Sequence, residues 1–261
     1  MTMRTTLTAL AVLATLPAAT AAAQDAVAKR TRIGAGPQLV PSYPGADSIA
    51  VRPFIDVSRA TGDEEFVFEA PDESFGTSLF GVGDVAIGFA LGFEGSRTAR
   101  DVGAPVRKVG FTVEPGGFVQ YQIAPTLRVR TEIRKGIGGH RGWIGNVGAD
   151  YVLRDRDRSV FSIGPRITIG DGRFHRAYFG VSAADALATG LPRFDASGGI
   201  QAVGITTGLI RQITPVWGVY GYAKYDRLVA DPARSPIVRA FGSRDQVSGG
   251  VALTYTFGAR R

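Results

Sequence analysis

Alternation of apolar and polar residues is the feature that most constrains this 261-residue chain. In the stretch TLRVRTEIRK (126–135), every second position holds Leu127, Val129, Thr131 or Ile133, and charged residues fill the positions between. Successive side chains of a β-strand point to opposite faces, so such a stretch forms a strand with one apolar and one ionic face. Helical periodicity is nearly absent after residue 24, and we therefore predict an all-β fold.

The same alternation recurs along the chain, interrupted by turn signals rich in Gly, Pro and Asp. We expect about twelve strands, with ten as the alternative if 64–80 and 175–182 form short hairpins or loops. Besides 126–135, clear strands are predicted at 49–59, 85–94, 117–123, 143–153, 160–169, 216–227 and 246–257. Weaker strands are predicted at 32–40, 64–69, 75–80, 175–182 and 199–211.

The first 23 residues have the features of a secretory signal peptide. Arg4 gives a positive start, a short apolar run follows, and Ala21-Ala22-Ala23 supplies an A-x-A cleavage site. The apolar run is too short for a membrane anchor. We expect residues 1–23 to be removed and residues 24–261 to form one barrel domain. Loss of Arg4 lowers the net charge from +7 to +6, which is too mild to indicate a nucleic-acid partner.

Two all-β architectures remain possible for an exported chain. The chain has no cysteine, so the exported form is expected to fold without disulfides. After residue 23 no segment has about 18 consecutive apolar residues, so we expect no membrane-spanning helix. Alternating strands then indicate either a soluble sandwich or lipocalin-like barrel, which buries its apolar face, or an outer-membrane barrel, which turns that face toward lipid.

Three features favour the outer-membrane barrel. The polar rows are rich in Gly, Ala and Ser, which leave room in a narrow interior. Aromatic residues such as Trp143 and Trp217 stand at the ends of apolar rows, as in the girdles of membrane proteins. The last strand ends in VALTYTF (251–257). We predict a transmembrane antiparallel up-and-down β-barrel in the cell outer membrane, closed because open sheet edges in lipid leave backbone groups unpaired.

The ionic rows of such a barrel line its lumen. Charges in a narrow lumen either pair into a structural plug of salt bridges or leave a slightly cationic pore that favours anions. We favour the plug. The predicted lumen-facing charges are Arg32, Arg52, Asp56, Glu94, Arg128, Arg130, Glu132, Arg134, Asp150, Arg166, Lys224 and Asp226.

No catalytic motif is present in the sequence. The two histidines, His140 in GIGGHRGW and His175 in GRFHRAY, lie in or near predicted turns and have no serine or carboxylate at a recognised spacing. We interpret both as polar groups of loops, and we expect no enzyme activity, no cofactor and no metal site. A barrel hydrolase that uses both histidines is the remaining catalytic alternative.

Three sequence segments in the second half of the chain carry a family resemblance: AYFGVS (177–182), DALATGLPRFDASGGIQ (185–201) and YDRLVADPARSPIVRAFGSRDQVSGGVALTYTF (225–257). They resemble the MipA/OmpV family of outer-membrane proteins. Phe194 stands where Tyr is common in that family, and Pro232 intrudes after Asp231. The matching positions are Tyr178, Phe179, Gly180, Val181, Ser182, Gly198, Gly199, Arg227, Leu228, Asp231, Ser235, Pro236, Ile237, Val238, Gly242, Ser243 and Gln246.

The resemblance implies a β-barrel that acts as a scaffold. The founding member of the family bridges a lytic transglycosylase and a bifunctional murein polymerase during peptidoglycan synthesis, and other members have porin-like, adhesin-like or envelope-stress roles. We therefore expect a non-enzymatic scaffold linked to murein enzymes, with a small diffusion channel as the alternative. The expected partners are outer-membrane lipid, a lytic transglycosylase and a murein polymerase, and no nucleic acid.

Overall fold

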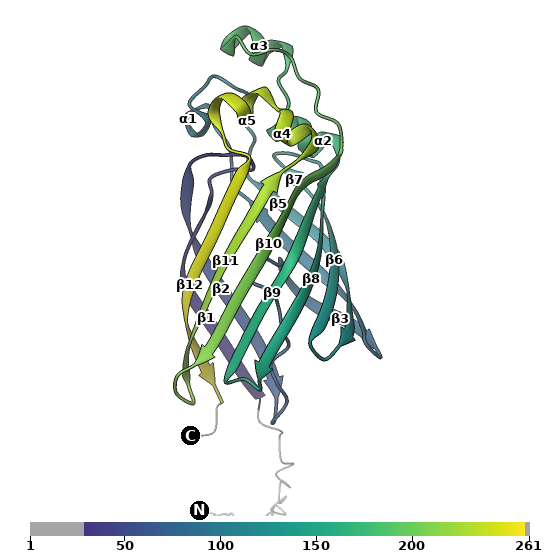
Figure 1. Ribbon diagram of the computed structural model, residues 1–261, viewed down its shortest axis with the longest axis vertical. Helices are drawn as coiled ribbons and strands as arrows, with labels where there is room; N and C mark the ends of the chain where they lie inside the picture. Colours follow the sequence, from purple (N-terminus) through teal and green to yellow (C-terminus); the bar gives the residue numbers. More distant parts are fainter. Residues whose placement is uncertain (1–28, 259–261) are drawn as a thin grey trace, which may run out of the picture.

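A single curled antiparallel sheet forms the body of the molecule (Figure 1). The computed structural model describes residues 29–258, and the predicted signal peptide lies outside them. Neighbouring strands follow the order β2-β1-β12-β11-β10-β9-β8-β6-β5-β4-β3. The strands are β1 Lys29–Pro41, β2 Ile49–Thr61, β3 Phe75–Val82, β4 Val85–Glu94, β5 Thr112–Ala124, β6 Leu127–Lys135, β7 Ile137–Gly138, β8 Trp143–Asp155, β9 Ser159–Gly170, β10 Gly199–Gln212, β11 Trp217–Leu228 and β12 Asp245–Phe257.

The predicted all-β antiparallel barrel of twelve strands is confirmed, although one strand is not part of the wall. The two-residue strand β7 pairs only with β5, so eleven strands make up the wall. Two weaker predictions are wrong. Residues 64–69 form no strand, and residues 175–182 include the end of helix α2, Gly172–Tyr178. The Asp171 side chain caps this helix by accepting a hydrogen bond from the Phe174 N–H, a local signal that outweighs the weak alternation there.

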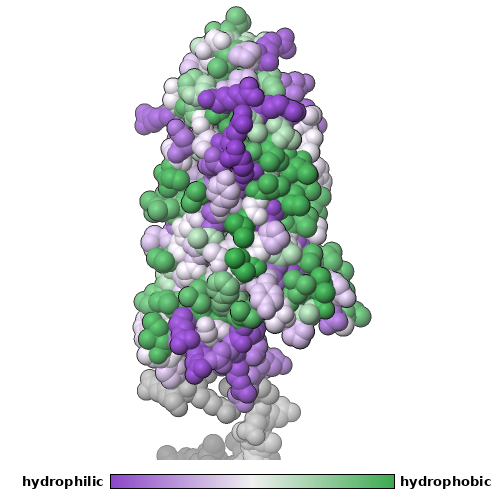
Figure 2. All heavy atoms as spheres, in the orientation of Figure 1, coloured by the Kyte–Doolittle hydropathy of each residue, from purple (hydrophilic) through white to green (hydrophobic). Residues whose placement is uncertain are grey.

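The barrel exposes its apolar residues on the outside. In β9, Phe161, Ile163, Ile167 and Ile169 are exposed, while the polar side chains between them are buried. In a soluble barrel the apolar side chains would be buried and the polar side chains would be exposed. On the face in Figure 2, hydrophilic residues gather at the two ends and hydrophobic residues occupy much of the stretch between. This inverted pattern is the one that a lipid environment requires.

The two ends of the barrel differ. Short helices in the long connections cover one end, and both described chain ends lie at the other, where Thr31 of β1 pairs with Phe257 of β12 (Figure 1). Bacterial barrels have short periplasmic turns and longer outer loops, so we assign the helical end to the outside. The remaining helices are α1 Ala99–Val102, α3 Ala183–Thr189, α4 Ala230–Arg234 and α5 Pro236–Phe241. None of the helices within residues 29–258 is long and apolar enough to cross a membrane.

The wall is interrupted between β2 and β3, which are the two ends of the sheet and form no ladder with each other. Both strands run from the helical end toward the terminal end, because the chain between them returns as residues 62–74, the inserted segment. Phe66 and Ala70 of this segment are buried. A groove of about 440 Å³ lies at this seam and is lined by both strands and by residues of the inserted segment. Continuous closure, which we expected, is therefore absent at this seam.

The exterior assignment predicts a depth-dependent cost for charge. Val251 is 63% exposed near the middle of β12, whereas Ile213 is exposed in a turn at the terminal end. We expect Val251→Arg to lower the free energy of unfolding by about 2–4 kcal/mol and Ile213→Arg by about 0–1 kcal/mol. Urea titration of the protein folded into lipid vesicles measures both. Equal, small effects at the two positions would contradict a lipid-facing β12.

Candidate functional site

A ladder of buried ion pairs runs along the inner face of β6. Arg128, Arg130, Glu132 and Arg134 are each at most 9% exposed. The Glu132 carboxylate accepts a 2.9 Å hydrogen bond from Arg130 and a second bond from Arg134. The Nε atom of Arg134 lies 2.9 Å from the Glu114 carboxylate of β5. Alternation places these side chains on one face, and antiparallel pairing brings the neighbouring strand's carboxylate beside them.

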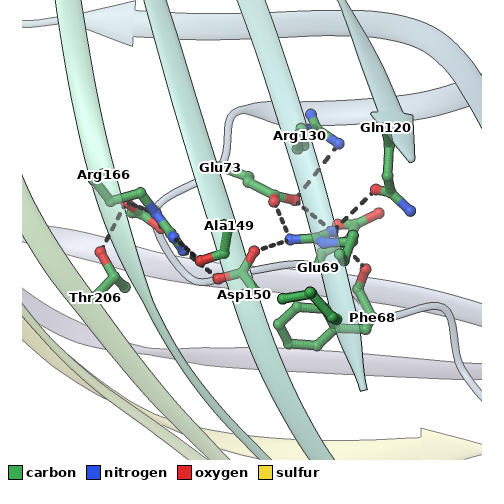
Figure 3. A network of polar contacts seen from close by, with 12 residues as sticks. Phe68, Glu69, Glu73, Gln120, Arg130, Ala149, Asp150, Arg166 and Thr206 are labelled. Atoms are coloured by element: carbon green, nitrogen blue, oxygen red, sulfur yellow. Dashed lines mark hydrogen bonds and ion pairs between the residues drawn. The ribbon is translucent and has the colours of Figure 1, made fainter. Parts of the chain in front are cut away.

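Asp150 of β8 joins this ladder to β9 (Figure 3). Its carboxylate accepts hydrogen bonds from Arg128 at 2.7 Å and from Arg166 at 2.6 Å. Asp150 is 1% exposed, so this carboxylate neutralises two cations away from solvent. Charged groups are tolerated in such surroundings only when they are paired and hydrogen-bonded.

Two carboxylates of the inserted segment complete the network. Asp72 lies 3.0 Å from Arg166 and 3.2 Å from Lys224. Glu73 binds Arg128 and lies 3.5 Å from Arg130. The wall therefore supplies an excess of cations at this level, and the inserted segment supplies the balancing anions. This charge balance explains why residues 62–74 lie inside the barrel instead of completing its wall.

Aromatic side chains of the inserted segment reinforce the same contacts. The Arg32 guanidinium lies 4.8 Å from the ring centre of Phe66. The Arg128 guanidinium lies 4.5 Å from the ring centre of Phe68 and also donates a 3.1 Å hydrogen bond to the Phe68 carbonyl. Cation–π contacts strengthen when they are shielded from water. The segment is thus held at several successive positions.

The remaining predicted lumen charges lie above and beside the network. Arg52 lies 3.6 Å from Glu94, and Lys224 lies 3.0 Å from Asp226. These two pairs are near a cavity of about 270 Å³ toward the helical end, which Arg52, Glu94 and Asp226 help to line. Separately, Arg32 lies 3.5 Å from Asp56.

Open space within the network itself is small. A cavity of about 30 Å³ lies among Asp72, Glu73, Arg130 and their neighbours, room for about one water molecule. Sequence reasoning missed Asp72, Glu73 and Glu114. The first two belong to a Pro-Asp turn signal that gives no hint of burial, and Glu114 precedes Pro115 and two glycines, where alternation is hard to follow.

Family-motif residues build the helical end. Tyr178, Phe179 and Val181 are buried in one apolar cluster with Ile237 and Val238. The cluster joins the connections between β9 and β10 and between β11 and β12. The motif segments therefore describe the packing of the helical end, called the cap below, and not the interior charges.

Polar motif residues fasten the cap. The Ser235 hydroxyl donates to the Phe179 carbonyl at 2.7 Å, and the Gln246 side chain bridges Gly45 N–H and the Ala46 carbonyl at 2.9 Å each. At Gly242 an added Cβ would lie 2.1 Å from the Gly45 carbonyl oxygen, so this close approach requires glycine.

The other motif positions lie around this cap. Hydrogen bonds from Ser197 and Arg234 lower the pKa of Asp231 to about 2. Ser182 caps α3, and Pro236 occupies the first turn of α5. Leu228 is buried in the apolar cluster, while Arg227 pairs with Asp245 at the surface. Gly180 follows α2, Gly198 and Gly199 lead into β10, and Ser243 precedes β12.

The two histidines are buried, which corrects their interpretation as simple loop groups. His140 is 4% exposed, its Nε2 lies 2.8 Å from Glu114, and its Nδ1 accepts the Gly142 N–H at 3.0 Å. His175 is 1% exposed in α2 and lies 2.6 Å from the Ser197 carbonyl through Nδ1. Within residues 29–258 no group of three His, Cys, Asp or Glu side chains is arranged to hold a metal ion.

Comparison with protein families identifies the chain. The family model described as MltA-interacting protein MipA matches residues 33–257. The chain belongs to the MipA family. This match confirms the resemblance seen in the motif segments, and together with the apolar exterior it identifies the MipA-family chain as an outer-membrane β-barrel of a Gram-negative bacterium. A search of curated proteins gives no match.

Solved structures show only distant likeness. The N-terminal β-barrel domain of OprF from Pseudomonas aeruginosa is 12% identical, with 67% of this chain and 98% of that chain covered and a TM-score of 0.26. OmpT of Vibrio cholerae is 8% identical (88% and 97% covered, TM-score 0.34). The outer-membrane protease OmpT of Escherichia coli is 12% identical (88% and 97% covered, TM-score 0.27). At these TM-scores the protease activity of the last protein does not carry over.

Loss of one inserted carboxylate is expected to destabilise the barrel. Asp72→Asn leaves Arg166 and Lys224 short of a buried partner, so we expect the free energy of unfolding to fall by about 3–5 kcal/mol. Asp155→Asn is the matched control, because Asp155 and its partner Arg158 are mostly exposed and such pairs contribute about 0–1 kcal/mol. Urea titration in micelles compares them. A D72N effect as small as that of D155N would contradict this role of the inserted segment.

Burial makes the cap sensitive to pH through His175. Burial lowers the pKa of His175 from its ordinary 6.5, against smaller opposite effects of the Ser197 carbonyl, Asp231 and Asp171. The folded cap therefore binds the proton less readily than the unfolded cap, and its stability falls as the pH falls below about 6.5. We expect amide protection factors in α2 to decrease over this range. In His175→Asn, which keeps an N–H donor, this decrease should be absent. If the variant shows the same pH profile as the unmodified protein, His175 is not the group responsible.

Proposed function

We propose that this MipA-family chain is a non-enzymatic scaffold that holds a lytic transglycosylase, and with it a murein polymerase, at the inner surface of the outer membrane. The observation that carries the proposal is the ion-paired interior, in which Asp72 and Glu73 of the inserted segment bind the cations of the wall. A barrel filled in this way is better suited to presenting a surface than to passing solutes. The name of the family model, MltA-interacting protein, supports the same role.

The terminal end offers a fixed surface for such a partner. Asp157, in the turn between β8 and β9, lies 2.9 Å from Arg30 of β1 and accepts the Phe66 N–H of the inserted segment at 3.0 Å. The turn is therefore tied to two other parts of the chain. Arg156 and Arg158 of the same turn remain exposed, and Arg158 pairs with Asp155, so Arg156 in particular presents positive charge toward the periplasm.

A small channel is the second candidate. The observation that favours it is the nature of the obstruction, since residues 62–74 are held by side-chain contacts and not by a strand ladder. Displacement of this segment would leave a lumen with excess positive charge, which favours anions. Planar-bilayer recordings should then show little conductance for the unmodified protein and clear, anion-selective conductance for D72N/E73Q. If neither protein conducts, the channel hypothesis is wrong.

Direct binding tests the scaffold. We expect the purified barrel, inserted in nanodiscs, to bind a purified MltA-type lytic transglycosylase, and we expect Arg156→Glu with Arg158→Glu to weaken this binding at least about tenfold, because each reversal replaces attraction by repulsion. The matched control, R193E/R239E, makes the same charge change in the outer connections. Surface plasmon resonance measures both. Undetectable binding of the unmodified barrel, or equal losses in the two variants, would count against the proposal.

A further inference from the structure

A basic hollow lies on the rim of the helical end, and one of its lining residues, His140, lies 2.8 Å from Glu114 of the interior network. It has a volume of about 820 Å³. Three segments that are distant in sequence form it: the connection between α1 and β5, the connection after β7, and helix α2. The charged residues that line it are Arg107, Lys108, Arg141, Arg173 and Arg176.

The positive charge of this hollow is only partly compensated, by Asp195 and by Asp185, whose carboxylate accepts the Arg107 N–H. No carboxylate lines it. Arg176 lies 3.8 Å from Asp195, whose side chain is 85% exposed. In the described part of the chain the other four cations form no salt bridge. Such an accumulation of one sign of charge in a concave surface attracts a multivalent anion.

Buried contacts hold the backbone that carries these cations. Arg97, 2% exposed, donates to the Arg107 carbonyl at 2.9 Å and to the Tyr178 carbonyl at 2.7 Å, and the Asp185 carboxylate accepts the Arg107 N–H at 2.8 Å. Arg141 has a φ of 53°, a left-handed conformation that is unfavourable for arginine. Strain of this kind persists only where the surroundings impose it, so the cations start from a prearranged frame.

Exposed apolar side chains lie in and near the hollow on the outer face of the barrel. Phe111 lines it and is 58% exposed, and Ile137 and Trp143, at the same end of the barrel, are 61% and 45% exposed. The Lys135 ammonium lies 5.1 Å from the Trp143 ring centre and donates to the Arg141 carbonyl at 2.7 Å. Aromatic and cationic residues occur together in this way at the boundary between acyl chains and headgroups.

We propose that this hollow binds the phosphorylated headgroup of a lipid in the outer leaflet. Arginine guanidinium groups match phosphate oxygens in geometry and charge. Phe111, which lines the hollow, and Trp143, which is linked to Arg141 through Lys135, fit the first carbons of the acyl chains. A soluble phosphate would use only the cations, whereas the lipid uses both parts of the surface. The occupant is therefore an amphiphile with at least one phosphate.

The experiment uses the purified full chain in detergent micelles and bis-phosphorylated lipid A as the probe. Native mass spectrometry and fluorescence titration measure the bound lipid and its Kd. We expect R107Q/R141Q/R173Q to raise the Kd at least about tenfold, because each cation near a membrane surface contributes a severalfold change. The control R193Q/R239Q/R244Q removes the same charge from exposed arginines of the same end that do not line the hollow and should leave the Kd within about twofold.

Measurements on the unmodified chain make the test independent of variant folding. Dephosphorylated lipid A should bind at least about tenfold more weakly than the bis-phosphorylated form, and millimolar inorganic phosphate should displace little of it. Equal binding of the two lipids would overturn the proposal, as would equal losses in the two triple variants. Complete displacement by inorganic phosphate would identify a soluble anion as the occupant and would also overturn it.

Discussion

Buried charge must be paired, and this requirement shapes the interior of the barrel. Arg128, Arg130 and Arg166 project from β6 and β9 into a space with little water, where an unpaired guanidinium is very costly. Asp150 and Glu132 from the wall satisfy part of this demand, and Asp72 and Glu73 satisfy the rest. The inserted segment is thus a component of the interior and not a disordered connection.

The seam in the wall follows from the same electrostatics. An up-and-down barrel needs every return of the chain to form a wall strand. Here one return, residues 62–74, lies among the interior cations, so β2 and β3 are left running in the same direction without a ladder. The edges that result carry backbone groups that lipid does not satisfy. These unpaired backbone groups cost free energy at this one seam, but the same arrangement of the chain keeps the ion pairs of Asp72 and Glu73.

The helical cap separates the family signature from the interior chemistry. Its apolar cluster and its Ser235 and Gln246 hydrogen bonds fix the outer connections. The same fixed connections carry the basic hollow at the lipid boundary, because Arg97 and Asp185 hold the Arg107 backbone. One end of the barrel is therefore organised toward the outer leaflet, while the exposed Arg156 and Arg158 stand at the other.

Alternation in the sequence determined most of the strands and which residues share a face, since side-chain direction in a strand depends only on position. Small residues in the polar rows and aromatic residues at the ends of the apolar rows then favoured an apolar exterior with charges such as Arg128 and Arg166 inside. The motif segments determined the family. Tertiary structure alone decided where residues 62–74 lie and which carboxylates neutralise the interior, because those contacts join Asp72 to Lys224 across 152 positions of sequence. It alone also brought Arg107, Arg141 and Arg173 together. Local pattern specifies the face of a strand, but the charge balance of an enclosed space depends on every segment that enters it.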